Sequence, residues 1–102
     1  MKIEMHPNEM VIRATDSNQL LNGDTIKGKL ILTNQRLYFK AQENGKKHND
    51  LEIMPGDIKD VMFFKNRMFF SNGLNVVTKN GTENKFLVKN RSGWSEMIVR
   101  MC

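Results

Sequence analysis

Asn-Gly pairs recur along this sequence and divide it into short segments. They lie at Asn22-Gly23, Asn44-Gly45, Asn72-Gly73 and Asn80-Gly81, and Pro55-Gly56 adds a further turn signal. Asn and Gly both tolerate the positive φ that tight hairpin turns require. The spacing of these pairs therefore predicts a chain of antiparallel strands joined by short turns.

Within the segments, apolar residues occupy alternate positions, which is the period of a strand with one buried face. Residues 26–33 and 36–42 show this alternation, and a two-residue link at Asn34-Gln35 would join them. Residues 74–77 lead into Asn80-Gly81, and residues 85–89 follow it. The alternation and the last residues of the chain predict one shared core, made of Leu30, Leu32, Leu37, Phe39, Val76, Phe86, Val88, Trp94 and Ile98.

The last eleven residues have a different period. Trp94, Met97, Ile98 and Met101 recur at spacings of three and four, which places them on one face of a helix. Ser92 is suited to cap that helix, because its hydroxyl can accept a hydrogen bond from a backbone N–H one turn on. The sequence predicts a helix over about 92–102 whose apolar face is buried.

The 102 residues fit one domain, and they are enough for a core without disulfide bonds. We expect a mainly β fold with about seven strands. Such a sheet hides its edges by curling into a bent antiparallel barrel or a sandwich, and the C-terminal helix would cover one open end. The single domain spans residues 1–102.

The run GKLILTNQRLYF, from Gly28 to Phe39, resembles the GRAM domain, a branch of the pleckstrin-homology-like (PH-like) superfold. That family shows a Gly-x-Leu-x-Leu-Thr-Asn-x-Arg-Leu-x-Phe run. The matching residues here are Gly28, Leu30, Leu32, Thr33, Asn34, Arg36, Leu37 and Phe39. The resemblance continues through LEIMPGDIKDV and NGLNVVTKNGTENKFLV to NRSGW, so that it covers roughly residues 8 to 101.

The resemblance implies a seven-stranded, strongly bent antiparallel barrel capped by a C-terminal helix. It also implies a binding module, since some relatives bind membrane lipids and others bind proteins, and the fold itself carries no catalytic activity. PH domains that bind phosphoinositides place several Lys or Arg in the first hairpin loop. The corresponding stretch here, ATDSNQLLNGDT, has two aspartates and no Lys or Arg, which does not favour that site. Arg36 is interpreted as a structural residue of the Thr-Asn-x-Arg turn.

Positive charge is concentrated in the second part of the chain. The net charge is +5, and residues 1–60 contribute none of it, because nine Lys or Arg balance nine Asp or Glu. The excess arises from residue 61 onward, where there are seven Lys or Arg and two acidic residues. Such an asymmetry is typical of a solvated basic surface or of a surface that meets an anionic partner.

The run VMFFKNRMFF at 61–70 carries more apolar residues than one strand face can bury. Alternation places Val61 and Phe63 on one face and Met62 and Phe64 on the other. A bulge or a sharp bend could bury both sets. The alternative is a candidate interaction patch in which apolar side chains lie beside two cations, made of Met62, Phe64, Lys65, Arg67 and Phe69.

Three classes of partner are consistent with such a patch. We favour another protein, or a second copy of this chain, because eight methionines suit adaptable contacts and exposed sheet edges associate readily. Peripheral binding to an anionic membrane lipid is the alternative. Nucleic-acid binding ranks third. Tyr38, between Arg36 and Lys40, is the only aromatic residue flanked by basic residues in the way that surfaces which stack nucleobases require.

No catalytic, cofactor or metal signature occurs, and no small-molecule substrate is implied. His6 and His48 lie in polar, turn-like stretches without paired ligands, and Cys102 is the only cysteine. No phosphate-binding glycine loop or Gly-x-Ser-x-Gly elbow appears. The amino-terminal residues lack an apolar run, and one cysteine is consistent with a reducing compartment. We expect a cytoplasmic binding module without a cofactor, with peripheral membrane attachment if its ligand is a lipid.

Overall fold

The computed structural model describes residues 4–21, 23–42, 50–65 and 72–102. This part of the chain folds into strands followed by one C-terminal helix, with a short 3-10 turn at Pro55–Asp57. The bounds are β1 Val11–Leu21, β2 Asp24–Thr33, β3 Leu37–Ala41, β4 Leu51–Ile53, β5 Ile58–Phe64, β6 Gly73–Thr78, β7 Glu83–Leu87 and α1 Arg91–Met101.

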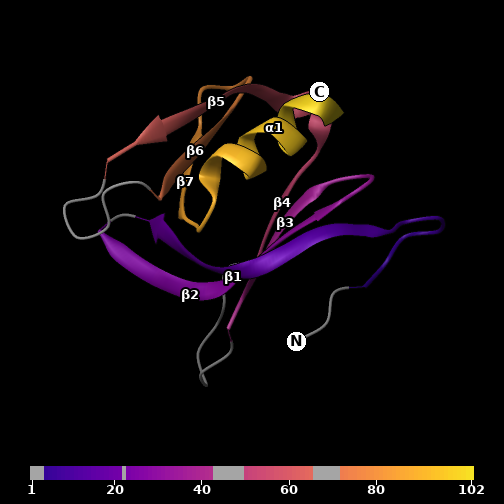
Figure 1. The fold of residues 1–102 in the computed structure, drawn as a ribbon, viewed down its shortest axis with the longest axis horizontal. Helices are drawn as coiled ribbons and strands as arrows, with labels where there is room; N and C mark the ends of the chain where they lie inside the picture. Colours follow the sequence, from indigo (N-terminus) through magenta and orange to yellow (C-terminus); the bar gives the residue numbers. More distant parts are fainter. Residues whose placement is uncertain (1–3, 22, 43–49, 66–71) are drawn as a thin grey trace.

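The strands form one antiparallel sheet in the order β4-β3-β2-β1-β7-β6-β5. β1 pairs with β2 from Val11 to Leu21, but it pairs with β7 only over Asn18–Leu20. The first half of β1 therefore diverges from β7, and the sheet bends there (Figure 1). The expected mainly β fold with seven antiparallel strands is confirmed, as a bent sheet that ends at β4 and β5 rather than a closed barrel.

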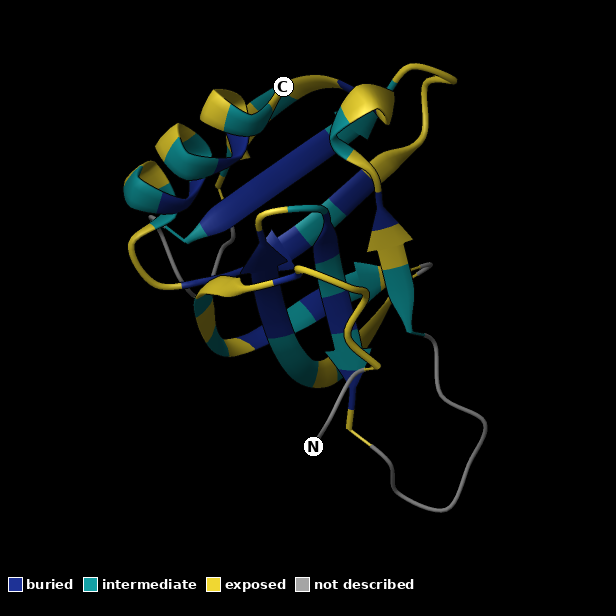
Figure 2. Ribbon diagram, turned by 90° about the vertical axis from the view of Figure 1, so that its right-hand side faces the viewer, coloured by how far each residue is buried: buried dark blue, intermediate teal, exposed yellow. Residues whose placement is uncertain are grey.

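Helix α1 lies against the β5–β6 part of the sheet and closes the concave side (Figure 1). Its buried positions face the sheet and its exposed positions face outward (Figure 2). Trp94 and Ile98 are fully buried in the same core as Phe39 and Phe86. All nine residues that the sequence assigned to the core belong to this cluster, so the predicted strand phase is confirmed.

The helix begins one residue earlier than the sequence predicts and has a different cap. Asn90, not Ser92, precedes the helix, and its side-chain oxygen accepts a 3.3 Å hydrogen bond from the N–H of Gly93. Asn90 has φ 56° and ψ 50°, a left-handed conformation that Asn adopts more readily than most residues. Asn90 therefore both turns the chain and caps the helix.

The glycines of two Asn-Gly pairs adopt turn conformations as expected. Gly23 and Gly81 have φ of 84° and 89°, the region that hairpin turns require. Gly73 differs, because it is the first residue of β6 and lacks a positive φ. A Cβ at Gly73 would collide with the carbonyl oxygen of Phe64, so that glycine permits close strand approach rather than a turn. The pair at 44–45 lies outside the described residues.

Candidate functional site

The Thr-Asn-x-Arg run forms the connection between β2 and β3. The hydroxyl of Thr33 accepts hydrogen bonds from the N–H groups of Gln35 and Arg36, at 3.1 and 3.0 Å. The Thr33 N–H in turn donates to the carbonyl of Arg36 at 2.9 Å. These bonds fix a tight three-residue turn, which is why the predicted two-residue link is one residue longer.

The same turn holds the segment that precedes β1. The Asn34 side chain accepts a 2.7 Å hydrogen bond from the Met10 N–H and donates one of 3.0 Å to the Asn8 carbonyl. The Gln35 amide donates to the Pro7 carbonyl at 2.9 Å. The side-chain amides of Asn34 and Gln35 therefore hold the backbone of the amino-terminal segment against the turn.

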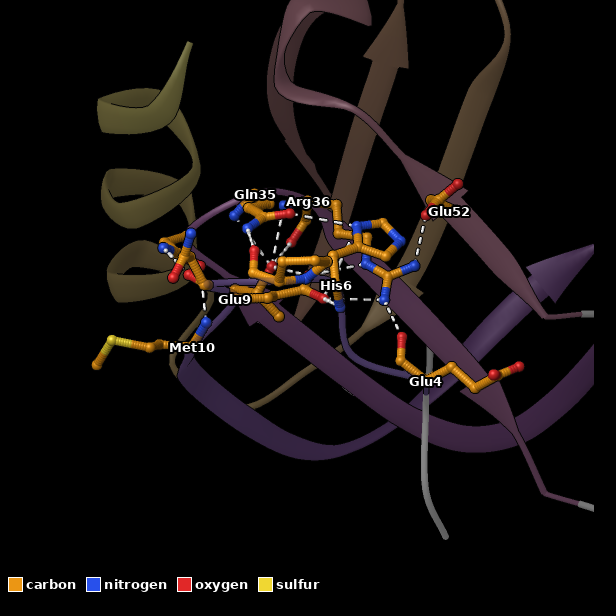
Figure 3. A network of polar contacts seen from close by, with 11 residues as sticks. Glu4, His6, Glu9, Met10, Gln35, Arg36 and Glu52 are labelled. Atoms are coloured by element: carbon orange, nitrogen blue, oxygen red, sulfur yellow. Dashed lines mark hydrogen bonds and ion pairs between the residues drawn. The ribbon is translucent and has the colours of Figure 1, made fainter.

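Arg36 completes this connection with an ion pair inside the protein (Figure 3). Its Nε and Nη2 donate to the two carboxylate oxygens of Glu9 at 2.8 and 3.1 Å. Its Nη1 donates to the Glu52 carboxylate at 2.5 Å, and its Nη2 also donates to the Glu4 carbonyl at 2.7 Å. The side chains of Glu9 and Arg36 are 0% and 5% exposed. We call Glu9, Thr33, Asn34 and Arg36 the Arg36 clasp.

The ion pair shifts both pKa values in the direction that keeps the charges. The hydrogen bond from Arg36 lowers the pKa of Glu9 to about 2, against the opposing effect of burial. The hydrogen bond to Glu9 raises the pKa of Arg36 above its usual value. Arg36 is thus a structural residue, and its donors are directed at protein oxygens rather than at a ligand.

Tyr38 is also engaged within the protein. The Arg36 guanidinium lies 5.0 Å from the centre of the Tyr38 ring, and the Tyr38 hydroxyl lies 3.2 Å from the Asp50 carboxylate. Lys40 contacts the same carboxylate at 2.8 Å. Burial, followed by the charge of Asp50, raises the pKa of Tyr38. One face of the only candidate stacking ring is therefore occupied by Arg36.

The candidate interaction patch lies partly on β5, the strand at one end of the sheet. Met62 and Phe63 are 49% and 47% exposed, Phe64 is half-buried and Lys65 is exposed. Arg67 and Phe69 lie outside the described residues. We call the described residues Met62, Phe63, Phe64 and Lys65 the β5 patch.

The strand register places these side chains on two faces. Phe63 pairs with Leu74 and Val61 with Val76, two residues of the core cluster, whereas Met62 pairs with Asn75, which does not belong to that cluster. Strand alternation places Phe63 on the same face as Val61, yet Phe63 is 47% exposed, and among the described strands only β6 pairs with β5. Alternation alone therefore places Phe63 outside the patch.

Cations from two other elements lie against the β5 patch. The guanidinium of Arg91, at the start of α1, lies 4.4 Å from the centre of the Phe63 ring, and Arg91 donates to the Phe64 carbonyl at 2.9 Å. The ammonium of Lys85 on β7 lies 5.6 Å from the centre of the Phe64 ring. Neither cation could be identified from the sequence, because they follow Phe64 by 21 residues or more and are brought near by the sheet order for Lys85 and by the packing of α1 for Arg91.

The remaining candidates for chemistry show structural contacts. His6 Nδ1 lies 3.2 Å from the Gln35 side-chain oxygen, and the Cys102 thiol lies 3.3 Å from the Ile98 carbonyl. Burial raises the pKa of Cys102, which disfavours a reactive thiolate. No group of three or more metal-ligating side chains occurs among the described residues. His48 lies outside them.

The described part of the chain contains no helix that is both long and apolar enough to cross a membrane.

Similarity to known proteins appears at the level of structure. No protein-family model matches the sequence, and no curated protein matches it. The C-terminal domain of an unknown protein from Leishmania infantum is similar, with a TM-score of 0.76 and 16% identity over 93% of this chain and 86% of that one. The Vps36 N-terminal PH domain is similar with a TM-score of 0.72 and 16% identity, over 96% of this chain and 82% of that one. These similarities show the fold: this chain has a PH-like fold.

Proposed function

We propose that this chain is a non-catalytic, GRAM-like binding module that associates with another protein through the β5 patch. The observation that carries the proposal is the half exposure of Met62 and Phe63 on a strand at one end of the sheet, beside the cation of Arg91. Exposed apolar side chains rimmed by charge are typical of interaction sites. The PH-like fold supports a binding or scaffold role.

The GRAM-like branch of the PH-like fold is inferred from the side-chain contacts of the β2–β3 turn. The Thr-Asn-x-Arg residues that resemble the GRAM motif are those that form the Arg36 clasp. Each of these side chains has a defined partner in the amino-terminal segment, so that the motif performs a structural task here. This agreement between motif and contacts supports assignment to the GRAM-like branch.

An anionic membrane surface is the second candidate, because Lys65 and Arg91 lie beside the exposed apolar residues. The first hairpin favours a protein instead. Asp16 and Asp24 place negative charge on β1 and β2, and the Lys29 ammonium lies 4.0 Å from the Asp16 carboxylate. Cations that already face carboxylates attract a lipid headgroup less strongly. A cytoplasmic module that binds a protein fits this distribution of charge.

The first experiment selects peptides from a random display library on the immobilised chain, without choosing a partner in advance. The test variant is Met62→Ser with Phe63→Ser. The matched control is Met10→Ser with Met54→Ser, which changes two apolar side chains that are also exposed, at 68% and 41%, and lie outside β5. We expect the native chain and the control to enrich the same peptides and the test variant to lose them.

A vesicle experiment distinguishes the lipid alternative. Sedimentation with phosphatidylserine-containing vesicles should show no binding that depends on Met62 and Phe63. If the native chain binds these vesicles and the test variant does not, the β5 patch is a membrane site and the proposed protein function is wrong. If the test variant still enriches the same peptides as the native chain, the patch is not the protein site.

A further inference from the structure

The free edge of β5 offers backbone hydrogen bonds beside the exposed side chains. We propose that the partner is an extended segment with apolar and acidic residues, which pairs with β5 as an additional strand. This inference rests on the proposed function and specifies the partner's conformation and charge. Addition of a strand to an open sheet edge supplies main-chain hydrogen bonds for affinity and side-chain contacts for specificity.

The hydrogen-bond pattern identifies which groups of β5 face outward. The Val88 N–H donates to the Asn72 carbonyl at 2.8 Å, and the next pair along the two strands is Leu87 with Gly73. In an antiparallel ladder this makes Leu87–Gly73 a non-hydrogen-bonded pair, so Gly73 and Asn75 direct their backbone groups toward β5. Their partners there are Phe64 and Met62.

The intervening residues of β5, Val61 and Phe63, therefore direct their N–H and C=O groups away from β6. β5 is the terminal strand of the sheet, and no strand of the described chain pairs with this edge. A contact of Val61 supports the assignment, since its N–H donates to the side chain of Asp60 at 2.8 Å. Two N–H groups and two carbonyls thus face an incoming strand, and the Val61 N–H among them is held by Asp60.

Charge selects an acidic segment over a second copy of this chain. Arg91 contacts the ring of Phe63, and Lys65 follows β5 directly. The chain carries a net charge of +5, with the whole excess in residues 61–102, so two copies would bring like charges together at this edge. Glutamate or aspartate near Arg91 and Lys65, and apolar residues against Met62 and Phe63, would complement the edge on both faces.

Asp60 competes with the incoming strand. Its carboxylate is exposed and occupies the Val61 N–H, which an additional strand would use. It also repels an acidic partner. Natural sheets protect open edges with charged side chains of this kind. Replacing Asp60 should therefore strengthen strand addition, whereas an interface made by side chains alone would gain only from the change in charge.

The probe is a synthetic peptide of alternating valine and glutamate with blocked termini, and fluorescence polarisation measures its binding. We expect the native chain to bind it and Asp60→Ala to bind it more tightly, with Asp60→Asn between them. Val61→Pro removes an outward N–H without removing a bond to β6, and it should weaken binding about tenfold or more, as the loss of a main-chain bond and the clash of the ring imply. Circular dichroism checks that each variant is folded.

Peptides methylated on alternate backbone nitrogens provide a second measurement that does not depend on the folding of a variant. Methylation of one alternate set should abolish binding, and methylation of the other set should leave it unchanged. Binding that tolerates both sets, or no binding by the native chain, overturns strand addition. Strand addition can be overturned in this way while Met62→Ser with Phe63→Ser still loses its selected peptides. In that case the proposed function stands, and the partner contacts the β5 patch in a different way. Self-association of the native chain at this edge would also overturn the inference.

Discussion

Arg36 and Glu9 form a buried, two-point ion pair that joins the β2–β3 turn to the segment before β1. The pair is 27 residues apart in sequence, and both side chains are almost completely inaccessible. A buried charge that loses its partner is strongly destabilising, because no water replaces the lost contact. The stability of the PH-like fold at this end of the sheet should therefore depend on the pair.

Glu9→Gln should lower the free energy of unfolding by roughly 3–5 kcal/mol, the usual cost of removing one partner of a buried ion pair. Urea denaturation measures this change. The matched control is Glu52→Gln, since Glu52 contacts the same guanidinium but its side chain is 43% exposed. The control should lose about 1 kcal/mol or less. Equal losses in the two variants would contradict a special role for Glu9.

The free energy of unfolding should depend on pH through the same Glu9–Arg36 ion pair. The pKa of Glu9 is about 2 in the folded protein and near 4.5 in the unfolded chain, so its contribution is present above pH 4.5. That contribution is lost as the pH falls from about 4.5 to about 2, because the unfolded chain then binds the proton more tightly. The difference in unfolding free energy between the native protein and Glu9→Gln should shrink over this window. A constant difference would indicate that Glu9 titrates normally.

Phe39→Ala should cost roughly 3–5 kcal/mol, the range for removing a buried aromatic ring. Phe39 is 1% exposed, and its ring centre lies 5.7 Å from that of Phe86. Thermal or urea unfolding measures the loss. Met10→Ala serves as the control, because Met10 is 68% exposed and should change stability by about 0.5 kcal/mol or less. A loss below about 1 kcal/mol for Phe39→Ala would be inconsistent with its place in the core.

Substitutions of Asn90 and Ser92 distinguish the two candidate caps of α1. Asn90→Ala should destabilise the protein by about 1–2 kcal/mol, because it removes the hydrogen bond to Gly93 and places alanine in a left-handed conformation. Ser92→Ala should be nearly neutral. Asn90→Gly should recover part of the loss, since glycine adopts this conformation without strain. If Ser92→Ala were the more damaging change, the cap would be at Ser92 after all.

Nucleic-acid binding should remain weak, with a dissociation constant above about 10 micromolar at physiological salt, as for non-specific association. The physical reason is that Arg36 covers one face of Tyr38 and is itself held by carboxylates. Titration with single-stranded oligonucleotides measures this. Submicromolar binding that disappears in Tyr38→Ala would show that the ring is available for stacking.

The sequence predicts the core well because local alternation specifies it. The period of two over residues 26–42 and the spacing of Trp94 and Ile98 each select one buried face without knowledge of the partners. The same reasoning fails at Asn72-Gly73, where glycine serves the close approach of β6 to Phe64 rather than a turn. A dipeptide preference cannot distinguish these two uses of a missing Cβ.

The candidate site is less predictable, because it depends on sheet order. Local alternation places Phe63 with Val61, but only the position of β5 at the end of the sheet leaves the Phe63 ring half exposed. Arg91 is 28 residues further along the chain and reaches Phe63 through the packing of α1. In the same way, no pattern near Arg36 indicates that Glu9 is its partner.

Mapping of amide chemical shifts during titration of the native chain with a display-selected peptide shows directly whether the peptide binds at the β5 patch. We expect the largest shifts on Val61, Met62, Phe63 and Arg91, and we expect Met62→Ser with Phe63→Ser to abolish them while Met10→Ser with Met54→Ser does not. Shifts concentrated instead on the β1–β2 hairpin around Asp24, with the β5 residues unchanged, would contradict binding at the β5 patch.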